Sequence, residues 1–404
     1  MSRRLFCFFL LVGIASAVCS AQSIAPPSPQ RVVIHSNILS EDRVIWVRMP
    51  AASQASKASY PVLYMTDGGS NVNEIGSTMD FLAENNRMPP LIVVGITHAD
   101  RVRDLTPTHV DVKDKDDTVN QFPTSGGANK FLDFIQTELV PEIEKRFPTK
   151  PYRIFAGHSL GGLFAIHALI SRPDLFNAYI AVSPSLWWDN AGTLHQAQQF
   201  FSAQKELKKT LFFSLGNEDG EMMGPFGELQ KTLGGNLPKG FAVKSAHYPD
   251  EDHNSTVLVA HYAGLRAIFD GWEVPRDPNG RVIGPLAVIE EHYQALSLRF
   301  GFSVSAEQGI NALGYDLLTE KKTDEAIAAF RRNVELYPLS ANVYDSLADG
   351  LEAKGETRLA IENLQKAVAI GTQNNDPGLL EFKRHLERLS AASKADSEKS
   401  HQPK

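Results

Sequence analysis

Short apolar runs alternate with longer amphipathic stretches along residues 30–270, and this alternation is the strongest constraint on the fold. Continuous apolar runs are typical of central parallel strands, because helices bury both faces of such a sheet. The amphipathic stretches between them, such as residues 127–146 and 160–170, indicate the covering helices. The sequence therefore predicts an α/β fold, a mostly parallel central sheet flanked by helices, with strands at residues 32–34, 44–49, 61–65, 91–96, 152–156, 178–182, 210–215 and 241–247.

Residues 1–21 have the pattern of a secretory signal peptide. Arg3 and Arg4 precede a short apolar run at residues 5–14, and small residues follow it. The run is too short to span a bilayer, so we expect cleavage after this segment and export to the periplasm or the medium. A lipoprotein signal ending at Cys19 is the alternative, although a bulky residue precedes that cysteine. Both cysteines of the chain lie in this segment, so the mature chain would hold no disulfide.

Composition and charge narrow the classes of partner. The apolar share of 43% suits a well-buried core, and the formal net charge is −7 without any basic stripe. Because nucleic acids are bound through clustered Lys and Arg, we expect no nucleic-acid partner. No apolar stretch after the N-terminal segment is long enough to cross a bilayer, so we expect no membrane span.

A repeat follows a stretch rich in Pro, Asp and Gly at residues 275–284. Apolar residues recur 34 positions apart in the pairs Leu313/Leu347, Leu317/Leu351, Ala326/Ala360 and Phe330/Leu364. That period, with two amphipathic helices per unit, is typical of tetratricopeptide repeats, and an ordinary helical bundle is the alternative. We expect this small all-α module to dock on the catalytic domain or on a protein partner.

The chain therefore divides into five predicted parts. These are a signal peptide at residues 1–21, a catalytic domain at 22–273, a linker and connecting helix at 274–304, two tetratricopeptide-like repeats at 305–372, and a capping helix with a polar tail at 373–404. Residues 391–404 are polar, and we expect them to be disordered.

The pentapeptide Gly157-His158-Ser159-Leu160-Gly161 stands between a predicted strand and a predicted helix. In that context Gly-x-Ser-x-Gly predicts a nucleophile elbow, a turn so tight that bulky residues beside the serine would clash. The turn raises the serine hydroxyl above the sheet and directs the Leu160 N–H toward a developing oxyanion. We therefore predict Ser159 as a catalytic nucleophile in an α/β-hydrolase fold.

A serine nucleophile needs a histidine base and an acid that orients the base; in this fold the acid and then the histidine follow the serine. His253 is the candidate base, because it follows the last predicted strand in a polar turn. The acid is expected just after residues 210–215, where Glu218 and Asp219 are neighbours. The usual spacing from the preceding glycine selects Asp219, and Glu218 is the alternative.

The second oxyanion donor is expected in the loop after the third strand, at residues 66–70. Two glycines there let the backbone direct an N–H into the site without an obstructing side chain. We favour Gly69 as the donor, with Gly68 as the alternative.

These motifs together resemble the putative-esterase branch of the α/β-hydrolases, which includes esterase D, the enterobactin-type siderophore esterases and the mycolyltransferases. The resemblance covers roughly residues 40–272. It rests on His253 and on the segments YMTDG (64–68), RDLTP (103–107), SGGA (125–128), GHSLGG (157–162) and SPSLWWD (183–189). It implies hydrolysis of carboxylic esters without a metal or an organic cofactor.

Three residues are candidates for substrate contact. Trp187 and Trp188 follow the strand at residues 178–182, where loops border the pocket, and their rings could stack on an aromatic acyl or catechol group. Packing of one ring in the core is the alternative. Arg103 could bind a substrate carboxylate, and an internal ion pair with an acidic neighbour is equally consistent with the sequence.

The leading prediction is an exported serine esterase acting on siderophore esters or other acylated small molecules through an acyl-enzyme. An acyltransferase is the first alternative, because it would use the same triad with a different acceptor. A binding protein that acts through its helical repeats is the second. The complete set of nucleophile, base and acid argues against it.

Overall fold

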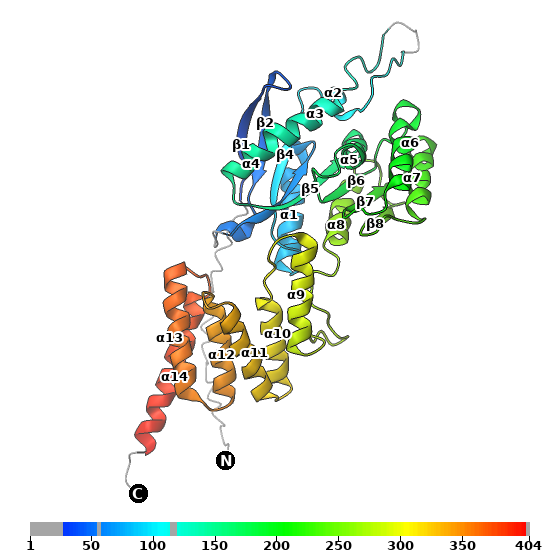
Figure 1. The fold of residues 1–404 in the computed structure, drawn as a ribbon. Helices are drawn as coiled ribbons and strands as arrows, with labels where there is room; N and C mark the ends of the chain where they lie inside the picture. The colour runs from blue at the N-terminus through cyan, green and yellow to red at the C-terminus, as the bar shows by residue number, and fades with distance from the viewer. Residues whose placement is uncertain (1–26, 55–57, 114–118, 401–404) are drawn as a thin grey trace, which may run out of the picture.

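The computed structural model describes residues 27–54, 58–113 and 119–400 (Figure 1). The predicted signal peptide lies outside these residues, so its cleavage and the export of the protein stay predictions. One eight-stranded sheet has the order β1-β2-β4-β3-β5-β6-β7-β8. Its strands are β1 (Gln30–Ser36), β2 (Glu41–Arg48), β3 (Tyr60–Met65), β4 (Ile92–Ile96), β5 (Thr149–His158), β6 (Ala178–Val182), β7 (Thr210–Leu215) and β8 (Ala242–His247).

The predicted mostly parallel sheet is confirmed. Strands β3 to β8 pair with one another in parallel, whereas β1 and β2 form an antiparallel extension that joins the sheet at β4. The carboxyl ends of the parallel strands therefore meet along one edge of the sheet. In open α/β sheets, binding and catalytic sites usually lie at this edge.

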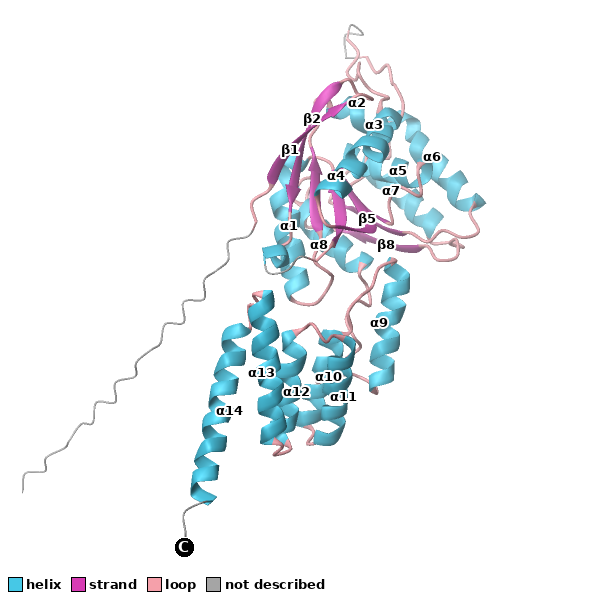
Figure 2. Cartoon of the chain, turned by 60° about the vertical axis from the view of Figure 1, so that its left-hand side comes forward, coloured by secondary structure: helices cyan, strands magenta, loops and turns pink. Residues whose placement is uncertain are grey.

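Alternate residues of β3 belong to two different apolar cores. Val62 and Tyr64 pack in one core, and Leu63 and Met65 in the other. Since side chains of a strand alternate between its faces, helices on both sides bury it, which explains the continuous apolar runs. The first core contains residues of α2 (Arg101–Leu105), α3 (Ala128–Phe134), α4 (Val140–Arg146), α5 (Leu160–Ser171), α6 (Trp188–Ala203) and α7 (Gly220–Leu233), whereas α1 (Gly68–Glu84) and α8 (Thr256–Ile268) contribute to the second (Figure 2).

Strained backbone lies at the carboxyl edge of the sheet. Asp67 follows β3, Ser159 follows β5 and Ser183 follows β6, with φ values of 57°, 60° and 42°. Side chains other than glycine rarely adopt this region, and strained residues persist only where the surroundings hold them. The turns that carry the predicted site are therefore held by their neighbours in the fold.

A C-terminal all-helical region follows the sheet domain. Its helices are α9 (Leu286–Phe300), α10 (Glu307–Thr319), α11 (Thr323–Leu336), α12 (Ala341–Ala353), α13 (Thr357–Asn374) and α14 (Leu379–Ser400). The first residues of α10 and α12 are 34 positions apart, as are those of α11 and α13. Two helical hairpins with the predicted period are thus present, while their classification as tetratricopeptide repeats stays a prediction. A protein partner for this region also stays a prediction.

The predicted apolar seam of the repeats is formed, with one exception. Its buried members are Ala326, Phe330, Leu347, Leu351, Ala360 and Leu364, with Leu317 partly buried beside them. Leu313 instead belongs to the second core of the sheet domain, because α10 packs against α9. The prediction of disorder from residue 391 was wrong up to residue 400, since α14 continues to Ser400.

The helical region shares a continuous apolar core with the sheet domain. Tyr293 and Phe300 of α9 are buried in the same cluster as Tyr152 at the start of β5 and Phe269 after α8. No helix in the described part of the chain combines the length and the apolarity that a membrane span needs.

Candidate active site

Ser159 occupies a tight turn between β5 and α5. Its φ and ψ are 60° and −119°, and its N–H donates to the Val182 carbonyl oxygen over 2.9 Å. A Cβ atom on Gly157 would lie 2.2 Å from the carbonyl oxygen of Gly161, and one on Gly162 would lie 2.8 Å from that of Val182. Glycine is therefore required where the strand and the helix approach each other, as expected for a nucleophile elbow.

The structure brings His253 next to this turn through His158. The Nε2–H of His158 donates to the His253 carbonyl oxygen over 2.7 Å, and the centroids of the two rings are 4.5 Å apart. Burial, together with the neighbouring His253, lowers the pKa of His158 to about 4, so this ring is neutral at pH 7. His158 thus holds the backbone of His253, a contact that the sequence did not predict.

Glu218 is the acid that contacts His253. Nδ1 of His253 lies 2.7 Å from Oε2 of Glu218, and the carboxylate is only 7% exposed. Oε1 accepts hydrogen bonds from the Ser183 hydroxyl at 2.5 Å and from the Gly216 N–H at 3.2 Å. Burial alone would raise the pKa of Glu218, but the hydrogen bonds from His253 and Ser183 outweigh it and lower the pKa below its ordinary value. The carboxylate is therefore ionised and aimed at the histidine.

The choice of Asp219 over Glu218 does not agree with this geometry. Asp219 is the N-cap of α7, and its side chain accepts the Glu221 N–H over 3.2 Å. Its carboxylate is thus engaged with a helix end instead of the histidine. The spacing from Gly216 selected Asp219. The hydrogen bonds with Ser183 and His253 instead place Glu218, the residue before it, in the site.

The Ser159 hydroxyl makes its hydrogen bond with Ser185, with 3.3 Å between the two oxygen atoms. Among the described residues, Ser159 makes no hydrogen bond to His253 within 3.5 Å. Such contacts are often long without substrate and shorten when it binds. Ser185 is almost fully buried and its N–H donates to the Ser159 carbonyl oxygen, so it supports the elbow from the loop that follows β6.

The two predicted oxyanion donors lie at two helix N-termini. Leu160 begins α5, and Gly69 is the second residue of α1, so neither N–H has a partner within its own helix. The loop before α1 lies against the elbow, because a Cβ atom on Gly161 would come within 2.3 Å of the Thr66 hydroxyl. Gly69 is exposed, whereas Gly68 is buried against the backbone of Gly95. The choice between these two glycines stays a prediction, with Gly69 the more accessible.

Arg101 is a site residue that the sequence analysis missed. Its guanidinium donates to both carboxylate oxygens of Asp67, at 2.7 and 3.0 Å, and to the His158 carbonyl oxygen at 3.0 Å. It therefore ties the loop before α1 to the residue before Ser159. Arg101 lies two positions before the family segment at residues 103–107, and nothing in the local sequence distinguishes it from Arg103.

For two of the three candidates for substrate contact, the structure shows the alternative that the sequence left open. Arg103 donates to Glu41 at 2.7 Å and to Asp104 at 2.9 Å, so its charge is used in an internal ion pair. Trp188 is only 1% exposed, and its indole N–H donates to the carbonyl and hydroxyl oxygens of Thr108. Trp187 is partly buried against the same core, and its contact with substrate stays a prediction.

The possible metal ligands of the described residues lie away from Ser159. In the part of the chain that the structure describes, one group of three could place its ligand atoms within 4.8 Å of one another, namely Asp349, Glu352 and His385. It belongs to the helical region, and Glu352 is already paired with Arg388 at 2.6 Å. The residues around Ser159 form no such group among those described.

The family model described as "Putative esterase" matches residues 36–239, just over half of the chain. The chain belongs to the putative esterase family. The predicted family and the predicted α/β-hydrolase fold are thereby confirmed, and the prediction of a carboxylic-ester hydrolase is confirmed at the level of the family. The match to the family model includes the elbow and the acid loop but ends before His253. The structure places His253 beside the elbow through its contact with His158.

Several known proteins are similar to this chain in sequence or in structure. The siderophore triacetylfusarinine C esterase of Aspergillus fumigatus is 31% identical over 175 residues, which are 36% of this chain and 60% of that protein. The ferri-bacillibactin esterase BesA of Bacillus subtilis is 30% identical over 230 residues, 52% of this chain and 78% of that one. An IroE-like serine hydrolase from Shewanella oneidensis has a similar structure, with a TM-score of 0.64 and 28% identity over 76% of this chain and 99% of its own.

Proposed function

We propose that this protein is a serine esterase that hydrolyses siderophore esters. The observation that carries the proposal is the contact of the buried Glu218 carboxylate with His253, whose backbone His158 holds beside Ser159. Nucleophile, base and orienting acid are the parts that acyl transfer from an ester requires. The substrate class rests on the two similar proteins named as siderophore esterases.

Acylation begins when the Ser159 oxygen attacks the carbonyl carbon of the ester and Nε2 of His253 takes the hydroxyl proton. Glu218 holds the ring with Nδ1–H toward itself, which leaves Nε2 free to accept that proton. The ionised Glu218 also stabilises the imidazolium that forms, because opposite charges attract strongly in a buried site.

The oxyanion of the tetrahedral intermediate would accept hydrogen bonds from the Leu160 N–H and from the N–H of Gly69 or Gly68. Collapse of the intermediate breaks the ester C–O bond, and His253 returns its proton to the leaving alcohol. His253 then takes a proton from water, whose oxygen attacks the acyl carbon of the Ser159 ester. The bond from that carbon to the Ser159 oxygen breaks, His253 returns the proton to Ser159, and a carboxylic acid is released. Arg101 would keep the loop that carries the second donor next to the elbow.

Activity toward siderophore esters tests this function. Triacetylfusarinine C, bacillibactin and enterobactin would be incubated with the protein, and their hydrolysis products separated by chromatography. We expect cleavage of at least one of them, and Ser159→Ala should lower kcat/KM by roughly 10⁴-fold or more without changing the circular dichroism spectrum.

Labelling with a fluorophosphonate separates the mechanism from the substrate. A covalent adduct on Ser159, located by mass spectrometry, is the expected result. An adduct on another serine would overturn the proposed nucleophile. Labelling at Ser159 with no cleavage of any siderophore would keep the serine esterase and reject the substrate class.

We also propose export, on the basis of the basic and apolar pattern of residues 1–21. In a bacterial host the full chain should appear in the periplasm or the medium, shortened by this segment. Recovery of the uncleaved chain from the cytoplasm would contradict the proposal.

A further inference from the structure

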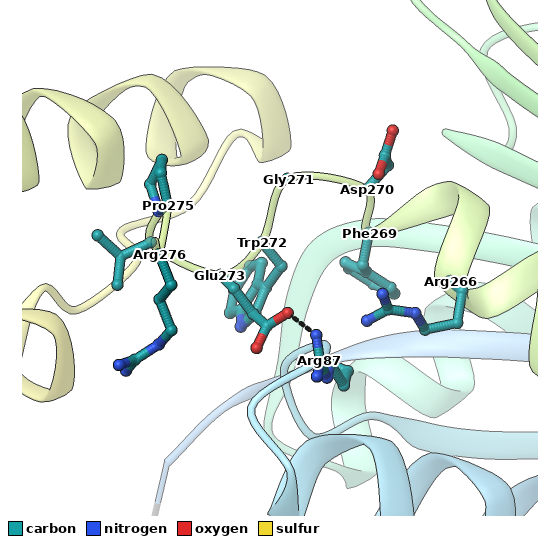
Figure 3. A pocket seen from close by; sticks show the side chains of 10 residues that line it. Arg87, Arg266, Phe269, Asp270, Gly271, Trp272, Glu273, Pro275 and Arg276 are labelled. Atoms are coloured by element: carbon teal, nitrogen blue, oxygen red, sulfur yellow. Dashed lines mark hydrogen bonds and ion pairs between the residues drawn. The ribbon is translucent and has the colours of Figure 1, made fainter. Parts of the chain in front are cut away.

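The carboxylate of Glu218 is held mainly by uncharged donors. Apart from its contact with His253, no cationic side chain among the described residues lies within 4.0 Å of it. Other carboxylates of the protein have an arginine partner, as Glu273 has in Arg87 in the pocket where the chain leaves α8 (Figure 3). An arginine fixes a carboxylate by charge as well as by geometry. The direction of the Glu218 carboxylate must instead depend on hydrogen bonds from neutral groups.

Two such donors reach Oε1, the carboxylate oxygen of Glu218 that does not contact His253. The Ser183 hydroxyl donates to it over 2.5 Å, and the Gly216 N–H over 3.2 Å. Hydrogen bonds to an ionised acceptor are short and strong, so the bond from Ser183 is the main restraint. Because a carboxylate is planar and rigid, holding Oε1 also directs Oε2, which lies 2.7 Å from Nδ1 of His253.

Ser183 is itself fixed by its surroundings. It is fully buried directly after β6, and its φ of 42° lies in the left-handed region that residues other than glycine rarely adopt. Its N–H donates to the Ser214 carbonyl oxygen of β7 over 2.8 Å. Strained residues of this kind persist only where neighbours hold them, and they are concentrated at functional sites. The strained backbone thus places the hydroxyl at the carboxylate.

The residues on both sides of Ser183 contact the nucleophile. The Val182 carbonyl oxygen accepts the Ser159 N–H over 2.9 Å, and the Ser185 N–H donates to the Ser159 carbonyl oxygen over 3.2 Å. This short segment is therefore attached to the backbone of the nucleophile at two points, while Ser183 reaches the acid from between them. It connects nucleophile and acid by a path that does not pass through His253.

We infer that Ser183 is a positioning residue that sets the Glu218 carboxylate, and through it the His253 ring, relative to Ser159. The inference rests on the proposed serine esterase mechanism. It gives a role to the first residue of the family segment at residues 183–189, in which only the tryptophans were candidates for the site. Because Ser183 acts through the acid, its loss should slow the chemical steps and leave KM nearly unchanged.

Kinetics of Ser183→Ala on a p-nitrophenyl ester test the inference in the full chain. We expect kcat to fall roughly 10- to 100-fold, as for a lost hydrogen bond to a charged group, with KM changed by less than about twofold. In a Glu218→Gln background the same change should lower kcat by less than about twofold further, because the carboxylate that it positions is gone. Equal losses in the two backgrounds would overturn the inference.

Ser183→Gly separates positioning from stability. Glycine adopts a φ of 42° without strain, so the melting temperature of this variant should not fall below that of Ser183→Ala. Its kcat should nevertheless stay about as low, since both variants lack the hydroxyl. Recovery of the wild-type kcat in the glycine variant would contradict the inference. Should Ser183→Ala unfold, the glycine variant still gives the answer.

Ser36→Ala is the matched control, in β1 at the edge of the sheet. Ser36 is also fully buried, and its hydroxyl donates to the Glu138 carboxylate over 2.5 Å. Its replacement should lower the melting temperature and leave kcat within about twofold of the wild type. A loss of kcat as large as that of Ser183→Ala would mean that any buried bond from serine to glutamate has this effect, and the inference would fail.

Labelling with a fluorophosphonate separates this inference from the proposed function. Slow labelling of Ser159 in Ser183→Ala, beside rapid labelling in the wild type, supports the inference. If the variant labels and hydrolyses the ester at the wild-type rate, the inference fails and the proposed function stands. If the wild type neither labels at Ser159 nor hydrolyses the ester, the proposed function fails, and the inference fails with it.

Discussion

The two ends of the central sheet are stabilised in different ways. At the carboxyl end, Ser159 and Ser183 adopt strained backbone conformations, and Glu218 is fully engaged in hydrogen bonds with its neighbours. At the amino end, the ring of Phe300 packs 5.1 Å from that of Tyr152 and 5.3 Å from that of Phe269. The first end depends on directional polar contacts, and the second on the amount of apolar surface removed from water.

This difference indicates which changes each end tolerates. A polar site fails when a single hydrogen-bonding atom is altered, because its partner is then left unsatisfied or misdirected. An apolar contact loses stability in proportion to the volume removed. The strained turns at the carboxyl end persist because the residues around them hold them in place.

The largest expected effect is on activity, at the acid. Glu218→Gln keeps the size of the side chain but removes its charge, so His253 loses its orientation and its partner. We expect kcat/KM on a p-nitrophenyl ester to fall by roughly 10³–10⁴-fold. Asp219→Asn is the matched control and should remain near the wild type, because asparagine also caps helices. A greater loss in the Asp219 variant would return the role of the acid to that residue.

The next effect is on stability, at the opposite end. Phe300→Ala should lower the free energy of unfolding by about 3–5 kcal/mol, as measured by urea denaturation. Leu298→Ala, two residues away and 79% exposed, should change it by less than about 0.5 kcal/mol. The folded fraction of the Phe300 variant should keep its kcat. A loss of kcat without a loss of stability would show that α9 shapes the active site.

The stability of the protein should depend on pH through a buried ion pair near the carboxyl end of the sheet. Asp104 is buried and pairs with Arg43 at 2.6 Å. Burial alone would raise its pKa, but hydrogen bonds from His98 and Arg43 lower it from 3.8 to about 2. A carboxyl group whose pKa is lower in the folded state stabilises the protein above its unfolded pKa, and loses that contribution as the pH falls through the folded value.

Asp104 should therefore contribute roughly 2 kcal/mol at pH 7 that disappears between about pH 4 and pH 2. Urea denaturation across that range should give a flatter curve for Asp104→Asn than for the wild type. The curve of Phe300→Ala should keep the wild-type slope, since no carboxylate is altered. If the free energy of unfolding changed equally with pH in all three proteins, groups other than Asp104 would be responsible for the loss of stability in acid.

The smallest expected effect is a loss of stability without a loss of activity, at Asp219 near the carboxyl end of the sheet. Asp219→Ala removes the N-cap of α7 and should cost about 1 kcal/mol of stability with unchanged kcat. Thermal unfolding and initial rates on the same sample measure both quantities. A fall in kcat beyond twofold would mean that this cap also holds Glu218 in place.

Much of the fold could be predicted because its signals are local. The strands were visible as continuous apolar runs, and the elbow as a glycine-flanked serine between a strand and a helix. The 34-residue period likewise appeared in the spacing of the helices. What failed was the assignment of neighbouring residues of similar chemistry, such as Glu218 and Asp219, or Arg101 and Arg103.

The sequence by itself determined the layered α/β architecture, the position of Ser159 and the helical repeat, since periodicity and steric limits act within a few residues. The tertiary structure alone decided which acid reaches His253, because Ser183 and His253 each lie 35 positions from Glu218 along the chain. It likewise decided that Trp188 is core and that Arg101 joins the site. A carboxylate or a guanidinium has the same local preferences wherever it occurs, and only the groups that the fold brings within hydrogen-bonding distance give it a role.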